Sequence, residues 1–496
     1  MAPYDYQPFE YVAPKGLTAP EPRHKIVIVG AGPIGLALAI DLAMRGIASV
    51  VLDDNNVVSV GSRAICWAKR TLEIFDRLGI GERMLDKGVV WQVGRLFNQE
   101  DEVYQFDLLP EEGHKYPAFI NLQQYYVEEY LIERARDFTD LIDLRFNNKV
   151  TAHEDKGAHI TLDIETPDGP YQLEADYMIA CDGAGSPTRK RMGLSFEGQT
   201  FNEHFLIADV VMEESPFVTE KAERWFWFKP PFHKGQSALL HQQPDNIYRI
   251  DLQLGPETDP EAENDAEKVM PRIEEIMKGK PFSLDWMSVY KFRCAKIDQF
   301  IHGRVIFVGD SAHVVSPFGA RGGNGGIHDV DNIGWKLAAL YDGTAGPDIL
   351  KSYDEERGHG AAENIANSSR ATNFMTPKSP IEMLFRDEVL NLASKAPFAR
   401  KLINSGRLSV PCSLAGLSFL TNGPCLAPVG EALKDAPLEG GKWLIEIMPA
   451  EFTLLAVGAC IAPRIAGVHR IGLNQSHDDY PCYQAARDFA NEDFAN

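Results

Sequence analysis

One carboxylate and a run of glycines stand close together in GDSAHVVSPFGARGGNGGIHD, residues 309–329. Gly309 and Asp310 follow the apolar run 305–308, which predicts a buried strand leading to the carboxylate. The glycines then leave the backbone N–H groups uncovered; they are Gly319, Gly322, Gly323, Gly325 and Gly326. A carboxylate suits hydroxyl groups and is unfavourable beside an anion, whereas bare N–H groups at a helix start suit negative charge. The expected ligand therefore has hydroxyls at one end and becomes negative at the other.

A second glycine pattern, in KIVIVGAGPIGLALAIDLAMRGIASVVLDDN, residues 25–55, has the spacing GxGxxG. Gly30 allows a tight turn, Gly32 lets a pyrophosphate approach the backbone, and Gly35 lets a helix pack closely on a strand. Asp53 comes at the end of the next apolar run, where its carboxylate can accept hydrogen bonds from an adenosine ribose and would repel a ribose phosphate. The pattern predicts NAD or FAD rather than NADP; the alternative is a glycine turn that binds nothing.

The residues around this pattern predict the elements that position it. The apolar run 26–29 is typical of a buried parallel strand, and the run 47–52 predicts a second one. Between them apolar residues recur every fourth position from Ile34 to Leu42, and Gly46 is placed to end the helix. The segment therefore reads as strand, helix, strand.

The composition limits the classes of partner. The chain has 496 residues, 44% of them hydrophobic, so it can bury a large core, and its length suggests about three domains. Its 49 basic and 71 acidic residues give a net charge of −22, which disfavours nucleic acid and anionic membranes. The apolar run 452–462 is shorter than the roughly 20 residues that span a bilayer. The first residues, MAPYDYQPFEYVAPKG, predict no secretory or transit peptide.

Seven cysteines are scattered along the chain without CxxC or zinc-ligand spacing; they are Cys66, Cys181, Cys294, Cys412, Cys425, Cys460 and Cys482. An odd, unpatterned set in a long chain indicates reduced thiols, so we expect a cytoplasmic protein. We expect no metal site and no Ser-His-Asp triad, because no motif for either stands in the sequence.

Three motifs in order carry a resemblance to a known family: GAGPIG at 30–35, YMIACDGAGSPTRKRMG at 177–193 and the stretch 309–329. With them the chain, over about residues 25–375, resembles the class A flavoprotein aromatic hydroxylases and is nearest to their 3-(3-hydroxyphenyl)propionate hydroxylase branch. The resemblance implies an α/β fold with a Rossmann-like FAD-binding domain of the GR2 type, an inserted β-sheet substrate domain and a short thioredoxin-like C-terminal remnant.

The cofactor that we expect is FAD, bound tightly without a covalent bond. FAD has a polyhydroxylated ribityl chain for Asp310 to face, and NAD has none. Gly322, Gly323 and Asn324 should open a helix running through 332–340 and offer N–H groups to the pyrimidine edge of the reduced isoalloxazine. The expected cofactor contacts are Gly30, Gly32, Pro33, Ile34, Gly35, Asp53, Asp54, Arg63, Gln124, Val150, Asp182, Gly183, Gly309, Asp310, Pro317, Gly322, Gly323 and Asn324.

Two of these contacts rest on smaller matches to the family. GSRAICWAKRTLEIFDRLG resembles its Arg-Ala segment, which places Arg63 near the pyrophosphate. NLQQYYVEEYL resembles its Gln-x-x-x-Glu-x-x-Leu pattern, which selects Gln124 over Gln123 because Glu128 and Leu131 then have the expected offsets. A surface salt bridge is the alternative for Arg63, and a helix cap is the alternative for Gln124.

The activity that the resemblance implies is that of an FAD-dependent monooxygenase in aromatic catabolism. Such enzymes bind NADH or NADPH transiently, use O2, and hydroxylate a small phenolic substrate through a flavin hydroperoxide. Only one GxGxxG unit is present, as in this family. The protein must then supply a dry pocket and a way to deprotonate the phenol.

The substrate pocket should be formed by strands at RWFWF (224–228), SALLHQ (237–242) and YRIDLQLG (248–255), where aromatic and apolar residues alternate with polar ones. Candidate substrate contacts are Trp227, His241, Tyr248 and Pro317, and the catalytic residues stay unknown. His241 could relay a phenolic proton near neutral pH. The alternative for each strand residue is packing within the sheet.

Other flavin chemistries stay open. WFWFKP resembles the Trp-x-Trp-x-Ile-Pro motif of flavin-dependent halogenases, although Lys229 stands in the isoleucine position and the glycine loop is GAGPIG rather than GGGxAG. Strand packing explains the aromatic pair better. A tailoring oxygenase that performs Baeyer-Villiger or epoxidation chemistry, and a flavin-binding protein without oxygenation, are further alternatives.

The domain organisation follows from these assignments. We expect an N-terminal extension (1–24), a discontinuous FAD-binding domain (25–200 and 290–375), a β-sheet substrate domain (201–289 with part of 90–120), a helical linker (376–422) and a truncated thioredoxin-like module (423–496). The last module has no CxxC, so it reads as a packing module, a homodimer contact or a partly disordered segment.

Overall fold

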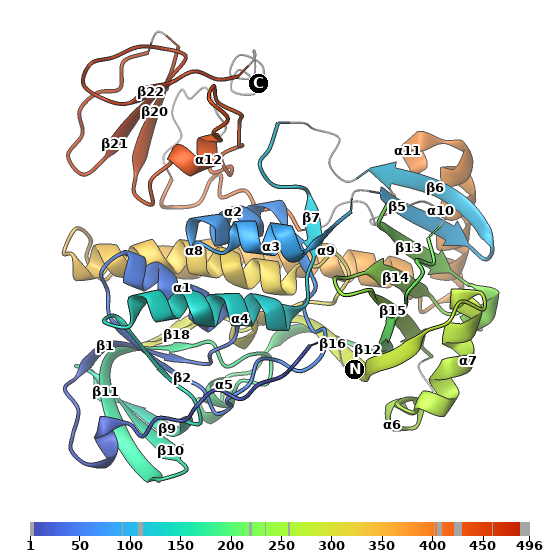
Figure 1. The fold of residues 1–496 in the computed structure, drawn as a ribbon, viewed down its shortest axis with the longest axis horizontal. Coiled ribbons are helices and arrows are strands. Elements are labelled where there is room, and N and C mark those ends of the chain that lie inside the picture. The colour runs from blue at the N-terminus through green and yellow to red at the C-terminus, as the bar shows by residue number, and fades with distance from the viewer. Residues whose placement is uncertain are drawn as a thin grey trace.

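The computed structural model describes residues 4–91, 93–107, 113–217, 221–233, 235–255, 258–400, 402–403, 409–420, 429–458 and 460–486. They form a mixed α/β fold, as predicted, with two large sheets and a layer of helices (Figure 1). The helices are α1 (Pro33–Met44), α2 (Lys69–Arg77), α3 (Gly81–Lys87), α4 (Gln124–Ala135), α5 (Pro187–Arg191), α6 (Pro260–Glu263), α7 (Ala266–Met277), α8 (Gly322–Tyr341), α9 (Ile349–Met375), α10 (Pro380–Lys395), α11 (Pro397–Arg400) and α12 (Leu444–Ile447).

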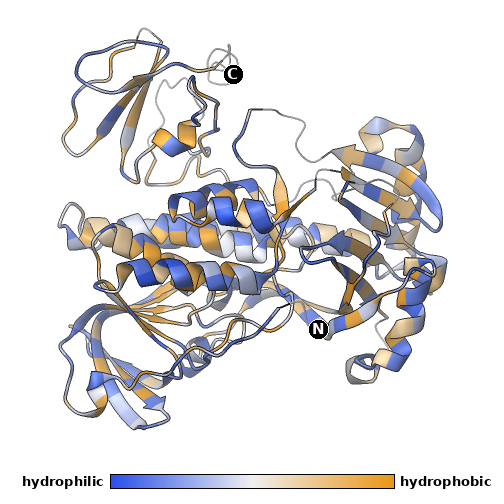
Figure 2. Ribbon diagram, viewed as in Figure 1, coloured by the Kyte–Doolittle hydropathy of each residue, from blue (hydrophilic) through white to orange (hydrophobic). Residues whose placement is uncertain are grey.

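The first large sheet contains the strands predicted around GxGxxG. Its order is β17 (Ile301–His302), β18 (Val305–Phe307), β11 (Gly169–Ala180), β1 (His24–Val29), β2 (Ser49–Leu52) and β8 (Ile142–Arg145), and β9 (Lys149–Asp155) and β10 (Ile160–Thr166) extend it from β11. The strands from β18 to β8 run parallel. Residues 26–29 of β1 and all of β2 are buried, which is why both read as continuous apolar runs (Figure 2).

Helices cover this sheet, and α1 lies between α8 and α4 (Figure 1). It packs against both α4 and α8, so every residue from Gly35 to Ala43 is buried. The buried Asp41 carboxylate is paired with Arg45 (Oδ2 to Nε, 3.0 Å) and with Arg77. The helix ends at Met44, just before Gly46 with φ +75°, so the predicted strand–helix–strand unit is confirmed.

The second large sheet confirms the strands predicted at 224, 237 and 248. Its order is β19 (His313–Val314), β16 (Ser283–Lys296), β12 (Glu197–Val211), β15 (Ile247–Leu254), β14 (Ala238–Gln242), β13 (Glu223–Phe228), β5 (Val93–Asn98) and β6 (Asp101–Asp107). Neighbours are antiparallel except β13 and β5. Apolar residues of α7 cover one face of β12–β15, and parts of α9 and α10 lie against the other face of the sheet. Strands β13, β14 and β15 therefore have two buried faces.

Two smaller sheets complete the described chain. Strands β3 (Cys66–Ala68), β7 (Phe119–Asn121) and β4 (Val89–Val90) form one, and β20 (Thr453–Val457), β21 (His469–Leu473) and β22 (Cys482–Tyr483) form a parallel sheet near the C-terminal end (Figure 1). Lys115 bonds to this region, with its Nζ 2.8 Å from Glu446 Oε1 and its N–H donating to Asp435 (2.9 Å). Parts of the predicted module, 423–428, 459 and 487–496, lie outside the described residues.

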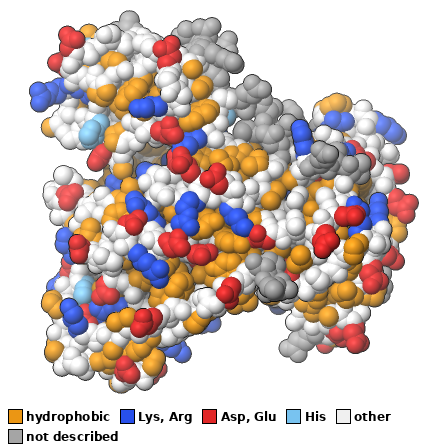
Figure 3. Space-filling view, viewed as in Figure 1, with side chains coloured by type: hydrophobic (Ala, Val, Ile, Leu, Met, Phe, Trp, Pro, Cys, Tyr) orange, Lys and Arg blue, Asp and Glu red, His pale blue; other side chains and the backbone are white. Residues whose placement is uncertain are grey.

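The surface and the cysteines agree with the composition. Acidic and basic side chains are interspersed with hydrophobic ones on the face shown in Figure 3. Within the described ranges, no helix has the length and the apolar character needed to cross a bilayer. The cysteines in those ranges are free thiols: Cys66, Cys181, Cys294, Cys412, Cys460 and Cys482.

Replacement of Gly35 by alanine should destabilise the fold. A Cβ on Gly35 would lie 1.9 Å from the carbonyl oxygen of Gly30 and 3.2 Å from Ile28 Cγ2, so α1 would have to move away from β1. We expect Gly35→Ala to lower the free energy of unfolding by about 1–3 kcal/mol in denaturant titrations. Gly346→Ala is the control, because a Cβ there meets nothing within 4 Å. Equal midpoints for the two variants would contradict this packing.

Candidate active site

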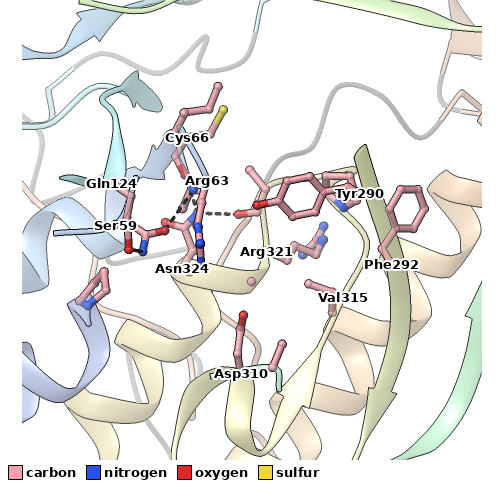
Figure 4. A pocket seen from close by; sticks show the side chains of 18 of the residues that line it. Ser59, Arg63, Cys66, Gln124, Tyr290, Phe292, Asp310, Val315, Arg321 and Asn324 are labelled. Carbon is pink, nitrogen blue, oxygen red and sulfur yellow. Dashed lines mark hydrogen bonds between the residues drawn. The ribbon is translucent and has the colours of Figure 1, made fainter. Parts of the chain in front are cut away.

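A cavity of about 590 Å³ lies where the first sheet, the helical layer and the second sheet meet. Figure 4 shows Ser59, Arg63 and Gln124 on one side of it and Tyr290 and Phe292 on the other. The predicted cofactor contacts that line it are Gly32, Pro33, Ile34, Arg63, Gln124, Asp182, Gly183, Asp310, Pro317, Gly322, Gly323 and Asn324. Residues distant in the sequence thus share one space.

The GxGxxG loop connects β1 to α1 with little space between strand and helix. Gly30 has φ +109°, and a Cβ on it would lie 2.4 Å from the carbonyl oxygen of Cys181. A Cβ on Gly32 would meet nothing within 4 Å, because this residue borders the cavity. The first N–H groups of α1 have no intrahelical acceptor and carry the positive end of the helix dipole. A pyrophosphate fits at this loop, and a side chain at Gly32 would take its place.

Asp53 lies beside this loop at the carboxyl end of β2. Its carboxylate accepts hydrogen bonds from the N–H groups of Ala31 (2.6 Å) and Asn55 (2.9 Å) and so holds the loop. Burial raises the pKa of Asp53. Asp53 and the exposed Asp54 do not line the cavity, and neither does Val150, whose side chain is buried in the core of the first sheet. Contacts of these three residues with an adenosine stay predictions.

Gln124 and not Gln123 reaches the cavity, in agreement with the choice made from the Glu128 spacing. The Gln124 side chain accepts a hydrogen bond from the Ala64 N–H (3.2 Å) and donates to Glu128 Oε1 (2.7 Å). Gln123 is fully buried and donates to the Pro244 carbonyl (3.3 Å). Arg63, next to Ala64, is exposed at the cavity. Gln124 and Glu128 therefore position the segment that carries Arg63.

The end of β11 forms another part of the wall. The Asp182 carboxylate accepts hydrogen bonds from the Ser186 hydroxyl (2.6 Å) and the Thr188 N–H (2.9 Å), which fixes the turn into α5. Gly183 has φ +75°, and a Cβ on it would meet nothing within 4 Å. Both residues border the cavity with bare backbone next to a carboxylate.

Asp310 projects from the turn that follows β18. Gly309 has φ +68° and donates its N–H to the Asp329 carboxylate (3.0 Å), so α8 holds the turn. The Asp310 side chain is exposed to the cavity although it lies deep within the protein, and this burial raises its pKa. A carboxylate that faces a cavity is suited to accept hydrogen bonds from hydroxyl groups.

The helix predicted after the second glycine run begins at Gly322, which confirms that prediction. Gly322 and Gly323 border the cavity with their backbone. The Asn324 side chain accepts from the Ala68 N–H (2.9 Å) and donates to the Cys66 carbonyl (2.9 Å), so it ties α8 to β3. The first N–H groups of α8 point to the cavity end and can stabilise negative charge there.

The residues with which the second sheet faces the cavity match the predicted candidates only in part. Trp227 and Tyr248 are buried among apolar residues on the α7 side and do not line the cavity, so the structure places them away from the expected substrate position. Successive side chains of a strand point to opposite faces. The residues of β13, β14 and β15 that face the cavity are therefore the sequence neighbours of those that face α7. The residues of the second sheet and the segment after it that line the cavity are Phe205, Ile207, Arg224, Leu239, His241, Arg249, Asp251, Tyr290, Phe292, Val315 and Phe318. His241 is on the cavity, as is Pro317.

Charged residues on this face were missed by the sequence reasoning. Asp251 accepts hydrogen bonds from Arg249 Nε (Oδ1, 2.9 Å) and faces His241 Nε2 (Oδ2, 3.0 Å). Burial, with a contribution from Arg224, lowers the pKa of His241 to about 3. The imidazole is therefore neutral at physiological pH. The ordinary pKa of histidine had predicted titration near neutrality, and in this structure His241 does not titrate there. Charged residues within otherwise apolar strands were the available sign of this cluster.

The Trp pair behind the halogenase alternative belongs to the protein core. Trp225 and Trp227 lie in the cluster that packs against α7, with ring centroids 5.5 Å apart. Trp225 donates its indole N–H to Glu223 (2.7 Å). Strand packing accounts for both residues, and neither lines the cavity.

The fold and this site define a dinucleotide-binding class, and the site fits FAD. The glycine loop at the start of α1 fits the phosphates, and the carboxylate facing the cavity fits the ribityl chain. The bare N-terminus of α8 fits the isoalloxazine. The family described as "FAD binding domain" matches residues 23–368, and the chain belongs to it. It is therefore an FAD-dependent monooxygenase of the family that includes the class A aromatic hydroxylases.

Individual relatives agree with this assignment. The chain is 30% identical, over 89% of its length and 90% of the relative, to a flavin-dependent monooxygenase of Mycobacteroides abscessus. It is 29% identical, over 76% of its length and 65% of the relative, to a 3-(3-hydroxy-phenyl)propionate/3-hydroxycinnamic acid hydroxylase of Mycolicibacterium gilvum. The solved structure of the anhydrotetracycline hydroxylase OxyS from Streptomyces rimosus matches with a TM-score of 0.69 and 26% identity, covering 91% of this chain and 90% of that one.

Replacement of Asp310 by alanine should weaken FAD binding without unfolding the protein. The Asp310 carboxylate faces the cavity, so its loss removes an acceptor for a ligand hydroxyl. A hydrogen bond to a charged group contributes about 1.5–3 kcal/mol, so we expect the Kd for FAD to rise roughly tenfold to a hundredfold. Flavin absorbance after dialysis, and fluorescence titration of the stripped protein, measure this change.

Asp310→Asn is the matched control for this experiment. The asparagine keeps one acceptor oxygen in the same place, so its Kd should fall between those of the native protein and the alanine variant. An alanine variant that retains all its flavin after extensive dialysis would show that Asp310 does not face the ribityl chain.

Proposed function

We propose that the protein uses NADH or NADPH and O2 to hydroxylate a small phenolic substrate in the 590 Å³ cavity. One observation carries the proposal: the glycine loops that suit FAD and a wall of aromatic side chains with buried polar groups border the same cavity. Substrate pockets in proteins have this character, mostly apolar with a few placed polar groups. The relative of M. gilvum is named for hydroxylation of a phenolic acid, which supports this choice.

The chain's own residues would hold the cofactor without a covalent bond. The loop Gly30–Gly35 and Arg63 would bind the pyrophosphate, Asp53 the adenosine ribose and Asp310 the ribityl chain. The N–H groups at the start of α8 would face the pyrimidine edge. Bound FAD would supply the hydride acceptor and the oxygen-activating group.

The second sheet would hold the substrate and exclude water. Phe205, Tyr290, Phe292 and Phe318 offer flat apolar faces to an aromatic ring. Ring contacts fix this wall internally, with Phe205 5.2 Å from Phe318 and 5.4 Å from Phe292 between centroids. A rigid apolar wall keeps water away from the reacting atoms.

The domain division and the role of the C-terminal region complete the proposal. Residues 25–200 and 290–375 would form the FAD-binding domain and 201–289, with part of 90–120, the substrate domain, because the strands of the two large sheets fall largely in these ranges. The region from 423 onward would be a thioredoxin-like module that packs on the protein or joins two copies. Its parallel sheet β20–β21–β22 supports a separate folding unit.

The purified, FAD-loaded protein should consume NADH or NADPH faster when a phenol is added, and form a hydroxylated product. A panel of phenols with and without a carboxylated side chain tests this by absorbance of the nicotinamide and mass spectrometry of the product. Incorporation of one oxygen atom from 18O2 into the ring identifies hydroxylation, whereas a lactone or an epoxide would identify the tailoring chemistries. An FAD-loaded protein that no phenol stimulates would contradict the proposal.

A further inference from the structure

Arg224 and His241 form a pair on the cavity face of the second sheet. They are direct cross-strand partners on β13 and β14, so their side chains project side by side from one face. Both line the cavity, and only 4% of Arg224 and 2% of His241 is exposed. Each has one buried nitrogen without a hydrogen-bond partner, Nε of Arg224 and Nδ1 of His241. Buried polar atoms are nearly always paired, so two adjacent exceptions indicate a ligand group.

The two unpaired nitrogens have opposite hydrogen-bonding roles. His241 Nε2 lies 3.0 Å from the Asp251 carboxylate, which only accepts, so Nε2 carries the proton of the neutral ring. Nδ1 is then an acceptor with a free lone pair, whereas Arg224 Nε–H can only donate. One donor beside one acceptor matches a hydroxyl group, which both accepts and donates. A carboxylate or an ether oxygen would leave Nδ1 unpaired.

The charges around the pair favour an oxygen that becomes negative. Arg224 and Arg249 are cations, and Asp251 pairs with Arg249 and His241 rather than with Arg224. Among the described residues Arg224 forms no ion pair with a carboxylate, although the charge of Asp251 acts on it. Its guanidinium lies over the rings of Trp91 (5.4 Å) and Phe226 (5.0 Å).

Two further titratable groups belong to the same cluster. Burial raises the pKa of Asp209 on β12 to about 7 and raises the pKa of the Cys66 thiol. The Cys66 sulfur accepts from Arg224 Nη1 (3.6 Å) and faces the cavity from β3 (Figure 4). At neutral pH the thiol is uncharged, so it does not neutralise Arg224. The charge of Asp209 acts with that of Arg249 instead.

Building on the proposed hydroxylase function, we propose that the substrate's phenolic hydroxyl binds between Arg224 Nε and His241 Nδ1, and that this pair ionises it. The phenolic O–H bond breaks, its proton passes to His241 Nδ1, and its electron pair stays on the oxygen next to the Arg224 guanidinium. Asp251 then stabilises the imidazolium through Nε2. The positive charge of Arg224 contributes to the lowered pKa of His241. A bound phenolate places a negative charge beside both residues, so it raises the pKa of His241 again.

Binding of 4-fluorophenol to the FAD-loaded protein tests the pair directly. Its 19F chemical shift reports ionisation, and 4-fluoroanisole has the same ring without the hydroxyl proton. We expect the phenol to bind at least about tenfold more tightly than the ether, and its apparent pKa to fall by about one unit or more on binding. A native protein that binds phenol and ether equally, or leaves the phenol pKa unchanged, overturns the proposal.

Matched variants separate the two nitrogens. Arg224→Gln and His241→Leu should each remove the pKa shift and the preference for the phenol. Arg224→Lys keeps a cation, and His241→Asn keeps an acceptor near the Nδ1 position, so each should restore part of the effect. Trp227→Phe, on the opposite face of the sheet, is the control. Thermal unfolding and flavin absorbance of each variant identify misfolding, and correctly folded Arg224→Gln and His241→Leu variants with native phenol preference overturn the proposal.

Turnover with a productive phenol distinguishes this inference from the proposed function. Arg224→Gln and His241→Leu should lower kcat and move its pH profile to higher pH, where the phenol ionises without help, while FAD binding stays native. Native pH profiles in both variants would overturn the role of the pair and leave the hydroxylase function intact. Absence of product in the native protein with every phenol would overturn the hydroxylase function, and the 19F measurement would still report on the pair.

Discussion

The carboxylate of Asp329 connects the segments on which the site depends. From α8 it accepts hydrogen bonds from the Gly309 N–H (3.0 Å) and from Arg357 Nε on α9 (2.6 Å), and it lies 2.7 Å from His313 Nε2 on β19. Burial alone would raise its pKa, but His313 and Arg357 lower the pKa of Asp329 to about 2. A fully buried carboxylate with three partners favours one arrangement, because loss of any partner leaves part of its buried charge uncompensated. This arrangement fixes Asp310 and the start of α8 at one cavity.

The position of the cavity follows from the parallel direction of the first sheet. Strands β1, β2, β11 and β18 all run the same way, so the loops after their carboxyl ends meet at one edge. Those loops carry the GxGxxG turn, Asp53, Asp182 and Asp310, which are far apart in the sequence. Ligands of open parallel sheets bind at this edge. The second sheet then closes the space from the other side, with β19 and β16 joining it directly to the turn after Asp310.

The cofactor side of the site was predictable because its patterns are local. The glycine spacing, the apolar run of β1 and the every-fourth-residue repeat of α1 occur within about 30 residues, and the helix begins and ends close to the expected positions. The substrate side was not. The strands were found. Which of their alternating residues face the cavity depends on where α7 packs, and α7 comes after β13, β14 and β15 in the sequence, so the strand sequences alone do not decide it. Aromatic residues pointed to Trp227 and Tyr248, which lie on the α7 face, and both faces of β13, β14 and β15 are buried, so apolar character alone does not tell the faces apart.

The two faces of the second sheet therefore carry separate tasks. The α7 face is apolar and contains the Trp pair and Tyr248, so burial of hydrophobic surface there stabilises the sheet. The cavity face holds Arg224, Arg249 and Asp251, whose desolvation is unfavourable and whose hydrogen bonds within the protein are incomplete at Arg224. Polar groups that cost stability are retained where a ligand completes their hydrogen bonding. Because side chains alternate along each strand, residues on the cavity face can change while the α7 face keeps its packing, so one fold can accept different aromatic substrates.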